Sequence, residues 1–120
     1  MKNPISILLV EDDKDDQEFF FEALSGLQNV TECKIANNGR EAIQMLENAA
    51  ILPEFIFMDI HMPQMNGIEC FSEIIRNPKT KHIPVTFLSS DLGKENIVLN
   101  LGAMGFIKKA PDGEALRKSA

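Results

Sequence analysis

Five short apolar runs recur along the chain, at residues 5–10, 30–36, 55–58, 83–88 and 104–107. The first, third and fourth runs contain almost only apolar residues, which is typical of strands buried on both faces of a sheet. The second run alternates, with Glu32 and Lys34 on one side and Cys33 and Ile35 on the other, as in an edge strand. The pattern therefore predicts five strands.

Between these runs, apolar residues recur at helical spacing at residues 13–27, 40–50, 68–75 and 94–101. Asp13 is placed to cap the first of these helices, Gly26 lies near its end, and Gly102 closes the fourth helix. A further short helix is predicted at residues 112–119. Strands and helices alternate with short connections, which indicates a mostly parallel sheet with helices on both faces.

The alternation predicts one α/β domain over residues 1–120, with three layers and five β–α units. The flavodoxin-like strand order 2-1-3-4-5 fits best, because it places the charged second strand at an edge and the first and third strands side by side at the centre. No linker, repeat or low-complexity tract divides the chain.

Composition and charge exclude several classes of protein. The 120 residues are 44% hydrophobic and 25% charged, as in a globular protein, and no apolar run approaches the roughly 18 residues of a membrane span. A net charge of −6 argues against direct nucleic-acid binding, which needs a basic surface. The chain starts at Met1 without an apolar signal core, so we expect no membrane insertion and a cytoplasmic location.

Polar residues follow four of the five predicted strands. Glu11 and Asp12 follow the first strand, Asp59 the third, Ser89 the fourth and Lys109 the fifth. Because the carboxyl ends of parallel strands meet at one edge of the sheet, we expect these side chains to lie together. Taken singly, each has a simpler explanation as a turn residue, a helix cap or a surface lysine, so the prediction rests on their joint placement.

The acids at this edge have two readings. Crowded carboxylates are tolerated when a divalent cation neutralises them, and ligands that are all oxygen favour Mg²⁺ or Mn²⁺. Alternatively, acids at a helix start complement the helix dipole and remain in solvent. We assign Glu11 and Asp12 to the metal, because they end a buried strand, and Asp13, Asp15 and Asp16 to the solvated helix start.

Four segments carry a resemblance to a known family: ILLVEDD, FMDIHMPQMNG, PVTFLSS and GAMGFIKK. From about Ile5 onward the chain resembles the receiver domain of two-component response regulators, of the stand-alone, chemotaxis-regulator-like type. The resemblance implies that Asp59 accepts a phosphoryl group from a sensor histidine kinase, a histidine phosphotransfer protein or a small phosphodonor. The domain would be a signalling phospho-acceptor in a phosphorelay rather than an enzyme acting on other substrates.

The resemblance also implies roles for the residues around Asp59. Asp12 would bind Mg²⁺ directly, Glu11 would act through water, and the backbone carbonyl of His61 would complete the protein ligands. The Ser89 hydroxyl would bond one phosphoryl oxygen.

Two further roles follow from the same resemblance. Lys109 would pair with another phosphoryl oxygen, and Ser89 and Phe106 would form a conformational switch. The residue after the lysine is usually proline in this family, whereas here it is Ala110, so a trans bond between Lys109 and Ala110 is expected.

Phe21 is a candidate partner-binding residue. Placing Phe20, Leu24 and Leu27 inward on the first helix rotates Phe21 by about 100° toward solvent. A single exposed apolar residue needs no function, but in receiver-like proteins the surface of this helix is where the bundle bearing the phosphohistidine docks.

Two other functions of this fold conflict with the sequence, and one alternative remains. An FMN site is disfavoured because the acids after the first strand would repel the FMN phosphate. A haloacid-dehalogenase-type phosphatase is disfavoured because it needs a second Asp two residues after the nucleophile, and His61 occupies that position. The remaining alternative is a degenerate receiver, a protein-interaction module that works without phosphorylation. The downstream protein target is unknown from the sequence, and homodimer formation is left open.

Overall fold

The computed structural model describes residues 5–27 and 30–109. In this part of the chain five strands form one parallel sheet in the order β2-β1-β3-β4-β5. The strands are β1 (Ile5–Val10), β2 (Val30–Ala36), β3 (Phe55–Met58), β4 (Val85–Ser89) and β5 (Gly105–Lys108). The predicted three-layer, flavodoxin-like α/β fold is confirmed.

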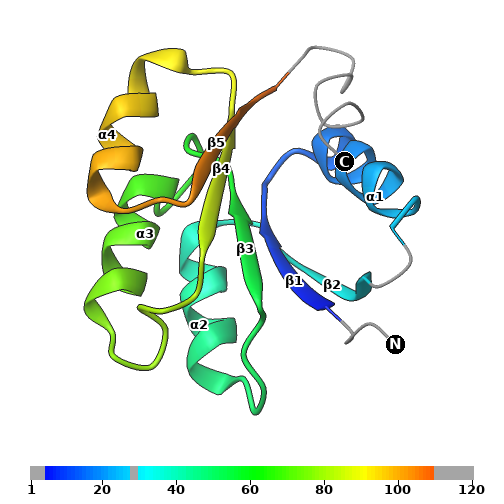
Figure 1. The fold of residues 1–120 in the computed structure, drawn as a ribbon, viewed down its shortest axis with the longest axis horizontal. Coiled ribbons are helices and arrows are strands. Elements are labelled where there is room, and N and C mark those ends of the chain that lie inside the picture. Colours follow the sequence, from blue (N-terminus) through cyan, green and yellow to red (C-terminus); the bar gives the residue numbers. More distant parts are fainter. Residues whose placement is uncertain (1–4, 28–29, 110–120) are drawn as a thin grey trace.

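Four α-helices cover the two faces of the sheet unequally. Among the described residues, helix α1 lies on one face of the sheet, and α2, α3 and α4 lie on the other (Figure 1). They are α1 (Lys14–Leu24), α2 (Gly39–Asn48), α3 (Gly67–Arg76) and α4 (Glu95–Leu101), with a short 3₁₀ helix, Leu92–Lys94, before α4. The predicted helix at 112–119 and the Lys109–Ala110 bond lie outside the described residues. None of the described helices has the length and apolar character needed to cross a membrane.

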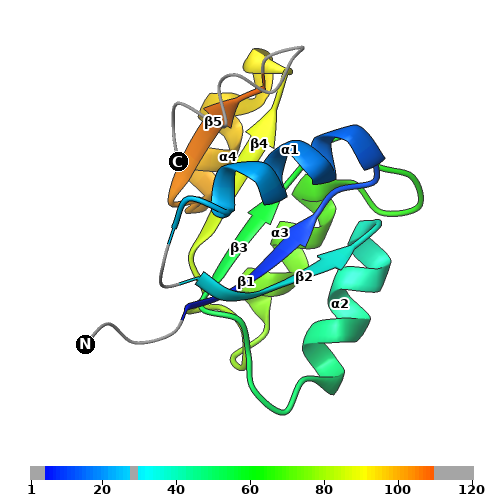
Figure 2. The same ribbon diagram turned by 90° about the vertical axis from the view of Figure 1, so that its right-hand side faces the viewer.

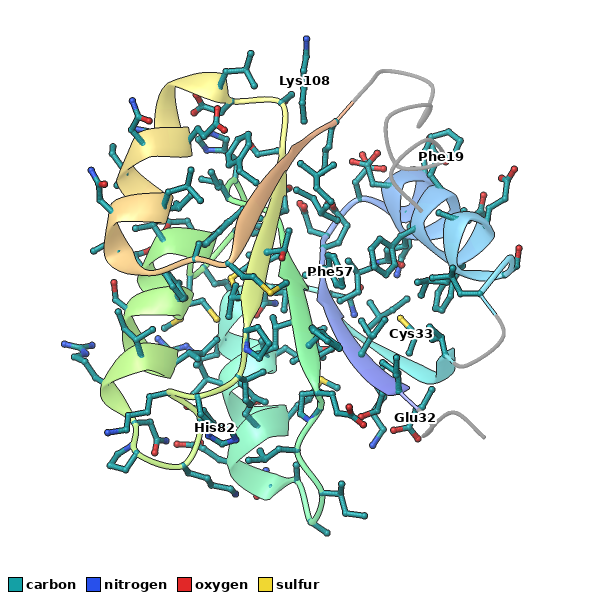
Figure 3. All side chains as sticks on the ribbon, in the orientation of Figure 1. Phe19, Glu32, Cys33, Phe57, His82 and Lys108 are labelled. Atoms are coloured by element: carbon teal, nitrogen blue, oxygen red, sulfur yellow. The ribbon has the colours of Figure 1, made fainter. Side chains whose placement is uncertain are left out.

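Within residues 5–27 and 30–109 the core consists of two apolar clusters, one on each side of the sheet. Alternate residues of β1 belong to different clusters. Leu8 and Val10 pack toward α2 and α3, and Leu9 packs toward α1. On the α1 side, the rings of Phe20 and Phe57 lie with their centroids 5.0 Å apart, and Figure 3 shows Phe57 between the sheet and α1. Helix α1 is therefore held to the sheet by aromatic packing.

Asx residues cap the first three helices, which begin near the carboxyl ends of the strands. Asp13 accepts a hydrogen bond from the backbone N–H of Asp16 at the start of α1, as predicted. Asn66 and Glu69 form a reciprocal capping box at the start of α3. Figure 2 shows these helix starts gathered with the strand ends at one side of the sheet. The caps therefore fix the loops at that edge.

Several predicted boundaries differ from those of the structure, and two of the differences have identifiable reasons. Helix α1 ends at Leu24 rather than near Leu27, because the Ser25 hydroxyl donates to a carbonyl of the last turn, and Leu27 is exposed rather than inward. Strand β4 begins at Val85 rather than at residue 83, because Pro84 has no N–H to give to the sheet. Strand β5 is shifted by one residue from its predicted range.

Candidate functional site

The acids predicted to meet do meet at the carboxyl ends of β1 and β3. Backbone hydrogen bonds continue one residue beyond each strand, from the Glu11 N–H to the Ala36 carbonyl at 3.0 Å and from the Asp59 N–H to the Val10 carbonyl at 2.9 Å. Both carboxylates are thus positioned by the sheet itself. The strands end at the upper side of Figure 1, where α1 begins.

Glu11, Asp12 and Asp59 each offer a carboxylate oxygen, and the three atoms lie within 4.8 Å of one another. Glu11 and Asp59 are buried, whereas Asp12 is exposed. Oxygen ligands at about 2.1 Å from one ion lie at most about 4.2 Å apart, so a small side-chain adjustment would bring the set around Mg²⁺ or Mn²⁺. The donor set therefore fits a hard divalent cation.

Burial makes the negative charge at this site unfavourable. It raises the pKa of Glu11 to about 7, with Asp59 adding to the effect and Lys109 opposing it. Burial also raises the pKa of Asp59, and here too Lys109 acts in the other direction. The negative charge of two neighbouring buried carboxylates is therefore stable only when a nearby cation neutralises it.

Lys109 supplies a fixed positive charge at the same place. Its ammonium nitrogen lies 2.6 Å from Glu11 Oε1, 2.8 Å from Asp16 Oδ2 and 3.3 Å from Asp59 Oδ2. Its side chain is only 12% exposed, whereas the neighbouring Lys108 extends outward from β5 (Figure 3). Lys109 therefore belongs to the acid cluster and is not a solvated surface lysine.

Ser89 and Phe106 lie on the two strands nearest to Lys109. Ser89 is buried, its hydroxyl accepts a hydrogen bond from the Asp91 N–H at 3.0 Å, and its carbonyl accepts one from the Lys109 N–H at 3.0 Å. Phe106 is half-buried and packs against the core cluster that contains Phe87, its partner on β4. The structure thus brings Ser89 beside Lys109, while the switch role of Ser89 and Phe106 stays a prediction.

His61 lies at the exposed rim of the site. Its Nε2 lies 2.7 Å from Oδ2 of Asp91, and this hydrogen bond lowers the pKa of Asp91. The pair joins the loop after β3 to the loop after β4. The proposed part of His61 in metal binding concerns its backbone carbonyl, and that role stays a prediction.

Two residues of the site were missed from the sequence. Asp16 was assigned to the solvated helix start, but its carboxylate bonds Lys109, which corrects that assignment. Gln17 is buried, and its amide donates to the Glu11 carbonyl at 2.7 Å and to Asn37 at 3.1 Å. The available signal was helical phase, since Gln17 lies three residues before the inward-facing Phe20.

The exposure predicted for Phe21 is confirmed. Its side chain is 41% exposed, whereas that of Phe20 is 4% exposed. Its contact with a partner stays a prediction.

Comparisons with known proteins agree with this geometry. Residues 7–120 match the family model of the response regulator receiver domain. The chain is 35% identical over 106 residues to a probable cyclic di-GMP phosphodiesterase of Vibrio cholerae, an alignment that covers 87% of this chain and 23% of that protein. The chain spans only part of several curated relatives, from 6% to 49% of their lengths.

Solved structures give the same result. The phosphorylated cyanobacterial phytochrome response regulator RcpA superposes with a TM-score of 0.88 at 29% identity, covering 97% of this chain and 88% of that one. The Mn²⁺-bound form of response regulator Rcp1 gives a TM-score of 0.83 at 25% identity, covering 96% and 91%. The family match, the strand order and the acid cluster agree, and the chain belongs to the response regulator receiver domain family, a family of signalling domains.

Proposed function

We propose that this receiver domain takes a phosphoryl group onto Asp59 and transmits a signal through a change in conformation. The observation that carries the proposal is the convergence on Asp59 of a partly buried lysine from the end of β5 and of two acids from the end of β1. The donor would be a sensor histidine kinase or a histidine phosphotransfer protein. The domain would catalyse only its own phosphorylation and dephosphorylation.

Glu11, Asp12, Asp59 and the backbone carbonyl of His61 are the groups that would hold Mg²⁺ or Mn²⁺. When bound, the cation would offset the charge of the carboxylates and of the incoming phosphoryl group. Support comes from the oxygen-only donor set and from Rcp1, a structural neighbour in its Mn²⁺-bound form.

The residues of the chain account for the remaining chemistry. A carboxylate oxygen of Asp59 attacks phosphorus, a P–O bond forms, and the P–N bond to the donor histidine breaks while its nitrogen takes up a proton from solvent. The transferring group is loose and highly charged, so catalysis consists mainly of positioning and charge stabilisation. Lys109 supplies the positive charge and Ser89 supplies a hydroxyl donor.

The direct test is labelling with acetyl phosphate in the presence and absence of Mg²⁺, followed by mass mapping of the modified residue. Magnesium-dependent addition of one phosphoryl group at Asp59 is expected. A degenerate receiver would show no labelling under either condition, and the presence of all the expected side chains argues against that alternative.

Ser89→Ala should uncouple phosphorylation from the conformational response. Without the hydroxyl, nothing would draw the end of β4 toward the phosphoryl group, so the packing around Phe106 would not shift between its two arrangements. The variant is expected to accept phosphate from acetyl phosphate more slowly than the wild type. NMR shift changes around Phe106 on phosphorylation should be lost.

Ser90→Ala is the matched control, because Ser90 is the exposed neighbour of the buried Ser89. It should keep both the labelling rate and the shift changes of the wild type. Identical shift changes at Phe106 in the wild type and in Ser89→Ala would rule out the switch.

Phe21→Ala should slow transfer from the cognate kinase or phosphotransfer protein by about tenfold, as loss of an aromatic anchor at an interface does. Labelling by acetyl phosphate, which needs no protein docking, should be unchanged. Thermal stability should fall by less than about 1 kcal/mol, since an exposed side chain contributes little to the core.

Phe20→Ala provides the contrast one position earlier on α1. It removes a buried ring that packs on Phe57 and should cost about 3–5 kcal/mol of stability. If Phe21→Ala lowers stability as Phe20→Ala does, or leaves kinase transfer unaffected, Phe21 is not a docking residue.

The surroundings of the domain are also part of the proposal. A cytoplasmic location would place it with its kinase, and a downstream protein of unknown identity would read its phosphorylated state. No direct nucleic-acid contact is proposed, in keeping with the net charge of −6.

A further inference from the structure

The ammonium group of Lys109 lies among three carboxylates in this structure, and Asp16 is one of them. An ammonium group has three N–H donors. Lys109 meets three carboxylate oxygens, and the contact to Asp16 at 2.8 Å is shorter than the contact to Asp59 at 3.3 Å. The lysine is therefore held more closely by an acid on α1 than by the residue proposed to receive the phosphoryl group.

Asp16 is held where it can make this contact. It is the third residue of α1, and its backbone N–H donates to the capping carboxylate of Asp13 at 3.1 Å, which fixes the first turn. Its side chain is 27% exposed. The preceding Asp15 belongs to the same turn, is exposed, and points about 100° away around the helix. Of the two neighbouring acids, only Asp16 bonds Lys109.

Burial works to lower the pKa of Lys109, but hydrogen bonds to Asp16 and Glu11 outweigh it and hold that pKa above its usual value. Asp16 therefore stabilises the charged ammonium in the resting site. This contact involves two charged groups and is partly shielded from solvent, so it is stronger than an ordinary surface ion pair.

A phosphoryl group on Asp59 would change what Lys109 must do. The new oxygens would carry about two negative charges and compete with Asp16 for the ammonium donors. The carboxylate of Asp16 would also repel the phosphoryl group across the short distance that Lys109 spans. Both effects act in the same direction, since each favours the unphosphorylated state.

We propose that Asp16 is a positioning residue that retains Lys109 in its resting arrangement and so restrains phosphorylation, a role that rests on the proposed function of Asp59. The same ion pair joins α1 to the end of β5. When Lys109 turns toward a phosphoryl group, the first turn of α1 loses a partner. Asp16 thereby links the state of the site to the helix that carries Phe21.

The test is a titration with beryllofluoride, a phosphoryl analogue, at saturating Mg²⁺ with binding followed by NMR. Asp16→Asn keeps the size of the side chain and removes its charge, and it should lower the apparent dissociation constant about three- to tenfold. Asp15→Asn removes the same charge from the same helix turn and should change it less than about twofold. Asp16→Glu keeps a carboxylate that can reach Lys109, so its apparent dissociation constant should remain close to that of the wild type.

A spectroscopic signature separates this role from a structural one. The ¹⁵N resonance of the Lys109 ammonium in the resting protein should shift in Asp16→Asn and stay unchanged in Asp15→Asn. Thermal stability in the absence of Mg²⁺ should be similar in both variants.

Several outcomes would overturn the role of Asp16. Weaker beryllofluoride binding in Asp16→Asn together with lower stability would mean that Asp16 merely supports the fold. If Asp15→Asn and Asp16→Asn change the beryllofluoride dissociation constant equally, the effect comes from the general surface charge and not from the contact of Asp16 with Lys109. These results are distinct from failure of the proposed function, which would appear as absent labelling of Asp59 in the wild type.

Discussion

Asp59→Asn is expected to lose phosphoryl labelling by acetyl phosphate, with a decrease of more than about a hundredfold, because an amide is a far weaker nucleophile than a carboxylate. The variant keeps the size of the side chain and an oxygen that can accept the Ile60 N–H, a bond of 2.8 Å in this structure. The fold should therefore persist. Intact-protein mass spectrometry measures the label, and circular dichroism checks the fold.

Two further variants serve as a control for charge and as a test of the metal site. Asp15→Asn removes an exposed acid that makes no contact with Lys109 and should label like the wild type. Asp12→Ala removes a proposed metal ligand, so its labelling should respond little to Mg²⁺. Undiminished labelling of Asp59→Asn, or a label mapped to another acid in the wild type, would show that Asp59 is not the acceptor.

Gly67→Ala is expected to cost about 3 kcal/mol of stability and to slow labelling at least tenfold, although Gly67 has no side chain in the site. A Cβ on Gly67 would lie 2.1 Å from the backbone carbonyl oxygen of Asp59 and 3.0 Å from Cα of Ile60. Both are backbone atoms, so neither can move aside as a side-chain end would. Helix α3 and the end of β3 would have to separate, and Asp59 would move with the backbone.

The glycine at position 26 provides a matched control. A Cβ on Gly26 would meet nothing within 4 Å, so Gly26→Ala should change stability by less than about 0.5 kcal/mol and leave labelling intact. Thermal unfolding and labelling rates measure both variants. If Gly67→Ala matches Gly26→Ala in stability and labelling, the tight approach of α3 to β3 does not position Asp59.

The fold and much of the site could be predicted because the pattern of apolar and polar residues determines the order of the elements and the position of the polar residues at the strand ends. Apolar runs separated by helical spacing gave the alternation of strands and helices, and a parallel sheet then places all strand ends at one edge. Glu11, Asp59 and Lys109 stand directly after strands, so their meeting follows from topology alone. No knowledge of side-chain packing was needed for that step.

The parts that could not be predicted depend on side-chain direction. Asp15 and Asp16 are the same residue type in the same helix turn, and only the orientation of α1 against β5 decides which one reaches Lys109. Leu27 continued the apolar pattern of the first helix, but a hydroxyl at Ser25 competes for the last carbonyls and ends it. Such outcomes are decided by tertiary contacts rather than by local pattern.

The ion pairs of Lys109 also affect how the protein becomes competent during synthesis and folding. They join residues 98 and 93 positions apart in the chain. Contacts of such separation carry a large loop-closure cost and form slowly, so Glu11 and Asp16 meet Lys109 only after the last strand has joined the sheet. A nascent or partly unfolded chain therefore has Asp59 without its lysine, and we expect it to be a poor phosphate acceptor.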